Sequence, residues 1–130
     1  MSLNDPLSNA ISHILNCEKM HKEKCIISKS SKLIKEVLLI LKENKYISDF
    51  KSIPSLRGES LEVNLNGNIN KCGVIKPRFS LKIGEYEKFE KRYLPAKDFG
   101  IIIISTPKGL MVHNKAMENK TGGKLIAYCY

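Results

Sequence analysis

Two adjacent hydroxyl residues near the end of the chain, Ser105 and Thr106, are the side chains best placed to do chemistry. They follow four consecutive isoleucines and precede Pro107, Lys108 and Gly109. A hydroxyl donates and accepts hydrogen bonds, a lysine carries a positive charge, and a glycine lets the backbone turn tightly. Together these groups suit a polyanion whose sugar or base edges are read by hydrogen bonds.

The same segment lacks the partners that catalysis requires. A Ser105–His113 nucleophile–base pair can be drawn, but no orienting acid or oxyanion hole goes with it. The chain also contains no phosphate-binding G-x-x-x-x-G-K-[ST], no dinucleotide G-x-G-x-x-G and no G-x-S-x-G elbow. We therefore expect no enzyme activity, no cofactor and no small-molecule substrate.

The four cysteines, at positions 17, 25, 72 and 129, form no C-x-x-C pair. Cys17, His21 and Cys25 recur at every fourth residue and offer three metal ligands, but the paired cysteines of structural zinc sites are missing. Cys72, Cys129 and Cys17 lie beside apolar residues, as small buried side chains do. The favoured interpretation is reduced, structural thiols with no metal, and the three-ligand site is the alternative.

The charge of the chain favours a polyanionic partner. Its 130 residues carry a formal net charge of +9 at pH 7. Residues 1–65 have 10 basic and 8 acidic side chains, whereas residues 66–130 have 12 basic and 5 acidic ones. Ser105 and Thr106 therefore lie in the more cationic half. Lysines that serve only solubility are the alternative interpretation.

Nothing in the sequence indicates a membrane partner. No stretch is apolar for long enough to span a bilayer. Residues 1–6 have no basic region followed by an apolar core, so we expect no secretory signal and an intracellular location.

The first half of the sequence predicts a helix–strand–helix–strand–strand lobe over residues 1–67. Asp5-Pro6 suits a helix start, and apolar residues at helical spacing follow it. The elements expected next are a strand over residues 24–28, a helix capped by Ser30 or Ser31, and strands over residues 46–53 and 60–65. Asn66-Gly67 is a hairpin turn signal.

The second half predicts a mostly β lobe over residues 68–130, with a short helix before its last strand. The elements expected are helices over residues 84–93 and 113–120 and strands over residues 100–104, 110–112 and 124–130. Tyr86, Phe89 and Tyr93 have helical spacing, which favours core packing over base stacking. The fold class predicted for the whole chain is therefore α/β (α+β), in two small lobes.

The first helix has an unusual exposed face, because its polar residues are short and uncharged. They are Ser8, Asn9, Ser12, His13 and Asn16. Such a face can approach sugar edges or phosphate oxygens closely. An ordinary solvated face is the alternative.

These motifs combine into a family resemblance that covers the whole chain. Ser105-Thr106-x-x-Gly109-Leu110-Met111, a helix, Gly122-Gly123 and a last strand that ends in aromatic residues resemble small-subunit ribosomal protein eight, the universal S-eight family. Asp5-Pro6-Leu7-x-Asn9-Ala10, Ser31-Lys32-Leu33-Ile34 and Tyr46-Ile47-x-x-Phe50 match its first lobe in the same order. Residues 70–79 and 88–95 resemble its archaeal and eukaryotic branch.

The resemblance implies a two-lobe, non-enzymatic protein that binds the central domain of small-subunit rRNA. It also implies neighbouring small-subunit ribosomal proteins as partners, a role in subunit assembly and translation, and a cytoplasmic location. An RNA-binding module that acts outside the ribosome is the alternative. The RNA contacts implied by matching motif positions are Ser105, Thr106, Gly109, Gly122, Gly123, Asn9, Ser31 and Lys32. Charge and position add Lys108 and Lys124 to these.

Two positions depart from the family pattern. Pro107 stands where the family commonly has a third hydroxyl residue, and Pro107 has neither a hydroxyl nor an N–H. Val112 stands where the family tends to place a threonine that caps the last helix. We therefore expect Asn114 or His113 to cap that helix.

Overall fold

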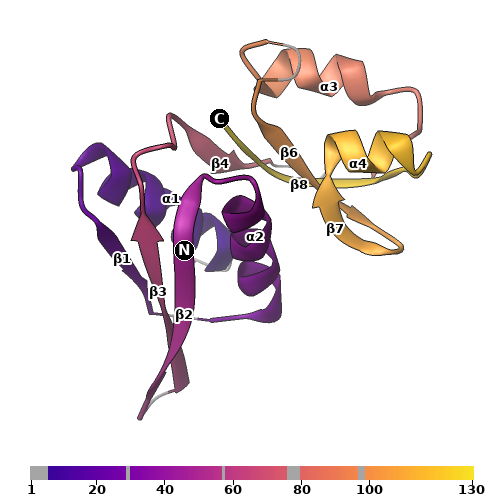
Figure 1. The fold of residues 1–130 in the computed structure, drawn as a ribbon. Helices are drawn as coiled ribbons and strands as arrows, with labels where there is room; N and C mark the ends of the chain where they lie inside the picture. The colour runs from indigo at the N-terminus through magenta and orange to yellow at the C-terminus, as the bar shows by residue number, and fades with distance from the viewer. Residues whose placement is uncertain (1–5, 29, 57, 76–79, 97–98) are drawn as a thin grey trace, which may run out of the picture. The chain divides into compact units, whose positions relative to one another are not determined.

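The computed structural model describes residues 6–28, 30–56, 58–75, 80–96 and 99–130, which fall into two compact units. The units are Met1–Asn70 and Lys71–Tyr130. The first contains, in chain order, α1 (Pro6–Lys19), β1 (Lys24–Ile27), α2 (Lys32–Glu43), β2 (Ile47–Ser55) and β3 (Gly58–Leu65) (Figure 1). Asp5, the expected cap of the first helix, lies outside the described residues.

The second unit is mostly β and contains two helices. Its elements are β4 (Cys72–Val74), β5 (Ser80–Leu81), α3 (Tyr86–Tyr93), β6 (Ile101–Thr106), β7 (Gly109–Val112), α4 (His113–Glu118) and β8 (Gly123–Cys129). The helices and antiparallel sheets confirm the predicted α+β class. No helix in the described part of the chain has the length and apolar character needed to cross a membrane.

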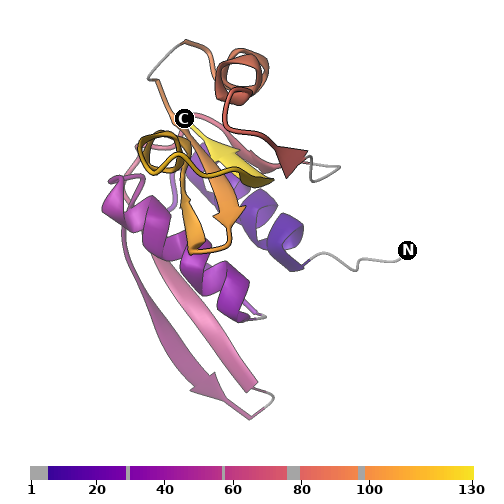
Figure 2. The same cartoon turned by 90° about the vertical axis from the view of Figure 1, so that its right-hand side faces the viewer.

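In the first unit, α1 and α2 cover one face of an antiparallel sheet with the strand order β1-β3-β2 (Figures 1 and 2). Alternate residues of β3 are buried because only one face of the sheet meets the helices. α2 begins at Ser31, whose hydroxyl accepts a hydrogen bond from the Ile34 N–H at 3.2 Å. Of the two caps predicted for this helix, Ser30 and Ser31, Ser31 is therefore confirmed.

The predicted hairpin at Asn66-Gly67 is wrong. β3 already has β1 and β2 as its antiparallel partners, and the chain leaves this sheet after Leu65. The Asn66 side chain instead accepts a hydrogen bond from the Asn68 N–H at 3.1 Å, and both asparagine amides donate to the Lys45 carbonyl. Asparagine mimics a backbone turn in this way, so the same dipeptide ends a strand here without starting a hairpin.

β8 is the strand on which the second unit is built. It pairs with β4, β5 and β6, and β6 in turn pairs with β7. Lys71 and Tyr130 exchange two backbone hydrogen bonds, at 2.9 and 2.8 Å. Opposite β6, the register passes from Ala127 to Leu125, so Ile126 is an extra residue of the kind found in β-bulges.

One face of this sheet packs against α3 and α4 through a shared apolar core. Ile102, Ile104 and Leu125 are almost fully buried in it. Tyr86 and Phe89 of α3 are buried in the same core, with Tyr93 packed against it. The aromatic stripe therefore serves packing, as its helical spacing predicts. Burial also raises the pKa of the Tyr86 hydroxyl, which donates to the Thr121 carbonyl.

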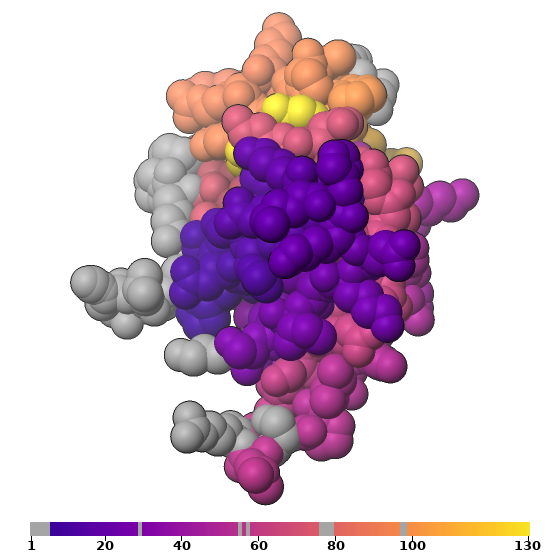
Figure 3. Space-filling model, turned by 90° about the vertical axis from the view of Figure 1, so that its left-hand side faces the viewer, coloured from indigo at the N-terminus to yellow at the C-terminus, as the bar shows by residue number. Residues whose placement is uncertain are grey.

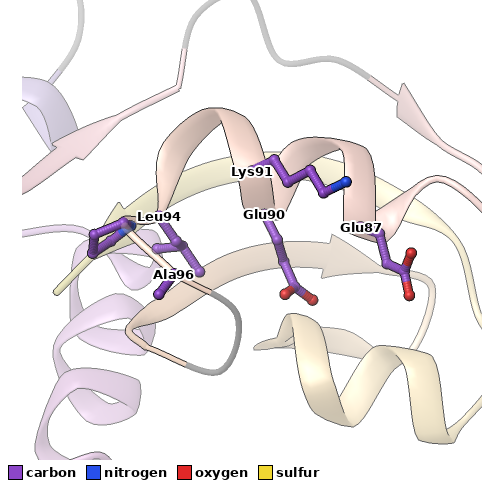
Figure 4. A pocket seen from close by; sticks show the side chains of 6 residues that line it. Glu87, Glu90, Lys91, Leu94 and Ala96 are labelled. Atoms are coloured by element: carbon purple, nitrogen blue, oxygen red, sulfur yellow. The ribbon is translucent and has the colours of Figure 1, made fainter.

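A buried polar pair lies between α3 and α4. His113 and Glu90 are 0% and 4% exposed, and His113 Nε2 lies 3.3 Å from Glu90 Oε1. Figure 4 shows the Glu90 side chain leaving α3 in the direction of α4. His113 Nδ1 accepts a hydrogen bond from the Ile102 N–H at 3.2 Å, which leaves the ring proton on Nε2, facing the carboxylate.

The prediction that Asn114 or His113 caps α4 is wrong. Val112 is the N-cap residue of this helix, and it makes no side-chain capping bond. His113 is the first helical residue, but its acceptor nitrogen binds the Ile102 N–H of β6 instead of the helix start.

His113→Ala should lower the free energy of unfolding by about 3 kcal/mol or more, because it leaves Glu90 without its imidazole partner and opens a cavity. Urea unfolding measures this. His21→Asn is the control, since His21 is exposed and asparagine tolerates its left-handed backbone (φ 56°). The control should change stability by less than about 0.5 kcal/mol. Equal small effects of the two substitutions would contradict the role of the buried pair.

Candidate nucleic-acid interface

Most of the predicted contact residues lie around the end of β6, the turn that follows it and the start of β8. In the second unit they are Ser105, Thr106, Lys108, Gly109, Gly122, Gly123 and Lys124. The other three, Asn9, Ser31 and Lys32, belong to the first unit.

Ser105 and Thr106 are the last two residues of β6, so this strand extends two residues beyond the end predicted for it at Ile104. Thr106 pairs with Gly109 across the β6–β7 ladder, and Pro107 and Lys108 form the two-residue turn between them. Gly109 has a φ of +117°, a backbone conformation that side chains other than hydrogen rarely allow. The strand continues past the isoleucines because this turn lets its last residues pair.

The Thr106 hydroxyl holds this turn together. It donates to the Gly109 carbonyl at 2.8 Å and accepts a hydrogen bond from the Lys108 N–H at 3.2 Å. Thr106 is only 8% exposed. Because the hydroxyl proton is already used inside the turn, Thr106 positions Lys108 and has little hydrogen-bonding capacity left for a ligand.

Ser105 belongs to a row of side chains that crosses β7, β6, β8 and β5. Its register partners are Leu110 on β7 and Lys124 on β8. Directly opposite residues of an antiparallel ladder project on the same face, with Cβ atoms about 5 Å apart. Ser105 is partly exposed, and Lys124 and Lys108 are exposed. The Ser105 hydroxyl therefore lies beside Lys124. The turn that carries Lys108 begins two residues after Ser105.

Gly122 and Gly123 let β8 approach its neighbours closely. A Cβ on Gly123 would lie 2.3 Å from the Ser105 carbonyl oxygen, and one on Gly122 would lie 2.4 Å from the Leu81 carbonyl oxygen. Both obstacles are backbone atoms, so neither can turn aside. The double glycine thus brings Lys124 beside Ser105.

Four described lysines of the first unit have acidic partners. In the first unit, ion pairs between 2.6 and 3.8 Å join lysines to acids: Lys24 and Lys51 to Glu62, Lys35 to Glu59, and Lys42 to Asp49. Hydrogen bonds from Lys35 and Lys42 hold the pKa values of Glu59 and Asp49 below their usual range. Among the described residues, Lys108 and Lys124 have no acidic partner. Their charge is available to an anion.

The three candidates of the first unit lie on two helices. Asn9 is exposed on α1 and lines a pocket of about 370 Å³, to which His13 and Ser28 also contribute. The Ser31 hydroxyl is occupied as the α2 cap, whereas Lys32 is exposed at the first turn of that helix.

A comparison with known protein families identifies the family of the chain. The model of the family described as ribosomal protein S8 matches residues 5–130. The chain belongs to the ribosomal protein S8 family. This family consists of small-subunit ribosomal proteins that bind rRNA and have a structural rather than an enzymatic role. The predicted S-eight resemblance is therefore confirmed at the level of the family.

The structure does not bring Ser105 and His113 together. Ser105 and His113 do not form a nucleophile–base pair, because the His113 ring binds the backbone N–H of Ile102. Ile102 and Ser105 are three residues apart on β6, a distance of roughly 10 Å along the strand. Ile102 and Ser105 also project on opposite faces of β6, since side chains alternate along a strand.

A second pocket in the S8 fold involves Glu90, which the sequence analysis did not single out. It has a volume of about 390 Å³ and is lined by Glu87, Glu90, Lys91, Leu94, Pro95 and Ala96 (Figure 4). The Glu90 carboxylate is already directed to His113. The mixed charges of the α3 sequence gave no signal that one glutamate would be buried.

Gly123→Ala should destabilise the second unit by about 2 kcal/mol or more, since the added methyl would overlap the Ser105 carbonyl oxygen. Thermal unfolding measures the effect. Gly84→Ala is the matched control, because a Cβ there meets no atom within 4 Å. It should leave stability within about 0.5 kcal/mol of the parent. The close-approach explanation fails if both substitutions have the same effect.

Proposed function

We propose that the surface formed by Ser105, Lys108 and Lys124 binds the central domain of small-subunit rRNA and thereby supports subunit assembly and translation in the cytoplasm. The observation that carries this proposal is the position of two exposed lysines, without acidic partners among the described residues, beside one partly exposed hydroxyl. The unit that holds them also contains the larger excess of positive charge.

The two kinds of side chain have different tasks in this proposal. Lys108 and Lys124 bind phosphates, which supplies affinity for any RNA. Ser105 donates to and accepts from sugar or base edges in the shallow minor groove or at unpaired bases, which supplies specificity. Thr106 acts indirectly, since its hydroxyl fixes the turn that presents Lys108.

Pro107 changes the turn without removing its function. It offers no hydroxyl and no N–H to the RNA, so one contact of the family pattern is lost. Its fixed φ also lowers the number of conformations open to the unbound turn. The proposed interface therefore gains preorganisation of Lys108 in exchange for that contact.

The proposal extends to a second contact region and to the position of the protein within its family. Asn9, Ser31 and Lys32 bind the adjacent RNA backbone, with Lys32 as the exposed cation. The resemblance of residues 70–79 and 88–95 supports membership of the archaeal and eukaryotic branch. Neighbouring small-subunit ribosomal proteins are the expected protein partners.

Lys108→Ala should weaken binding to the cognate rRNA fragment and to random RNA alike. Each phosphate contact contributes about 0.7 to 0.9 to the slope of log K against log salt, so the slope should fall by that amount. Filter binding at several salt concentrations measures it. Lys42→Ala is the control, because Lys42 is paired with Asp49. An unchanged slope for Lys108→Ala would refute its phosphate contact.

Ser105→Ala should weaken binding to the cognate fragment about five- to tenfold, the equivalent of one net hydrogen bond. Binding to random RNA and the salt slope should stay constant, since no charge is removed. Ser48→Ala is the control, because Ser48 is an exposed serine of β2 that is not among the proposed contact residues. A loss of equal size on both RNAs would show that Ser105 does not read sequence or shape.

Sedimentation of the native protein separates the ribosomal role from a role elsewhere. Cofractionation with small subunits, and crosslinks to the central domain in intact cells, are the expected results. A pool that is crosslinked to other RNA and lacks rRNA would favour an RNA-binding module outside the ribosome.

A further inference from the structure

A cluster of three metal-ligating side chains lies in the first unit and contains none of the residues proposed to contact rRNA. Its members are His13, Cys17 and Cys25, whose ligand atoms all lie within 4.8 Å of one another. The cysteines are 5% and 2% exposed, whereas His13 is exposed. The space-filling view in Figure 3 shows the residues of α1 and β1, in indigo and violet, at the surface of the molecule.

The secondary structure explains why these three side chains meet. His13 and Cys17 are four residues apart on α1 and therefore project from the same face, with His13 Nε2 4.0 Å from Cys17 Sγ. Cys25 is a buried residue of β1, the strand that packs against α1. The sequence spacing suggests His21 as the third ligand, but His21 follows the end of the helix and is not part of this cluster.

We propose that His13, Cys17 and Cys25 form a binding site for Zn²⁺, with a water molecule as the fourth ligand. Two thiolates and one imidazole are a ligand set that zinc takes when one position stays open. Zn–S bonds of about 2.3 Å and Zn–N bonds of about 2.0–2.1 Å in a tetrahedron place the ligand atoms about 3.5–3.8 Å apart. A contraction of about 1.3 Å or less from the present separations is needed, and the exposed His13 side chain has the room to provide it.

The charge of the ion would match the charge of its ligands. A coordinated zinc ion holds both sulfurs as thiolates. The complex of one Zn²⁺ with two thiolates has no net charge, which keeps the cost of burying it low.

An entry path exists on the side of His13. This residue lines the pocket of about 370 Å³ that also contains Asn9 and Ser28. The imidazole thus lies between the pocket and the two buried thiols, and a water ligand would occupy the pocket side. A bound ion would link α1 to β1.

The test is a titration of the reduced, chelator-treated full-length chain with Co²⁺, followed by displacement with Zn²⁺. One equivalent of Co²⁺ should bind, with thiolate-to-cobalt charge-transfer absorption and the visible bands of a four-coordinate ion, and one equivalent of Zn²⁺ should abolish both. No RNA is present, so the result is independent of the proposed rRNA function. A reduced chain that shows no such bands, or whose Cys17 and Cys25 can only be joined as a disulfide, would overturn the proposal.

Matched variants assign the ligands. His13→Ala and Cys25→Ala should each lower the affinity by more than about tenfold, since even residues that only orient a ligand contribute about 10- to 100-fold. His21→Asn and Cys72→Ala should bind like the parent, because they remove the same groups outside the cluster. His13 is exposed, so His13→Ala remains informative if a cysteine variant fails to fold. Equal binding by His13→Ala and His21→Asn would exclude the site.

Discussion

The close approach of β8 to its neighbours is the constraint on which the second unit depends. Gly122 and Gly123 lie where any side chain would collide with a backbone carbonyl of β5 or β6. Through this contact β8 starts its pairing with both strands, and the row from Leu110 through Ser105 to Lys124 becomes continuous. The surface that we assign to rRNA is thus a product of sheet packing, and the double glycine belongs to it through the backbone rather than through any group that a ligand could touch.

Much of the fold could be predicted because its elements follow simple periodicities. Apolar residues at helical spacing marked α1 and α2, and alternation marked β3. The predictions that failed concerned residues whose contacts join segments far apart in sequence. Asn66-Gly67 has hairpin chemistry, but its asparagines bind Lys45. From the sequence, Glu90 is one charge of a mixed-charge helix, and its buried contact with His113, 23 positions later, could not be predicted.

The candidate site shows the same division. The motif order identified Ser105 and Thr106, and the structure then separated their tasks, because neighbouring strand residues point to opposite faces. Thr106 is buried and bound within its turn, whereas Ser105 is partly exposed. The number of charged side chains can be read from the sequence, but the ion pairs among them cannot. Each printed lysine–acid contact of the first unit joins two different helices or strands. For the cysteines, the even spacing suggested His21, and helix geometry selected His13 instead.

The place of β8 in the chain has a consequence for how the molecule is made. β8 is the last strand of its unit in sequence, and it is the partner of β4, β5 and β6. A chain emerging during translation can complete the sheet of the first unit once β3 has appeared, since β1, β2 and β3 lie within the first 65 residues. In the second unit β6 can pair with β7 first, but β4, β5 and the other edge of β6 stay unpaired until β8 is synthesised. The order of the strands therefore lets the first unit complete its sheet before the second unit can.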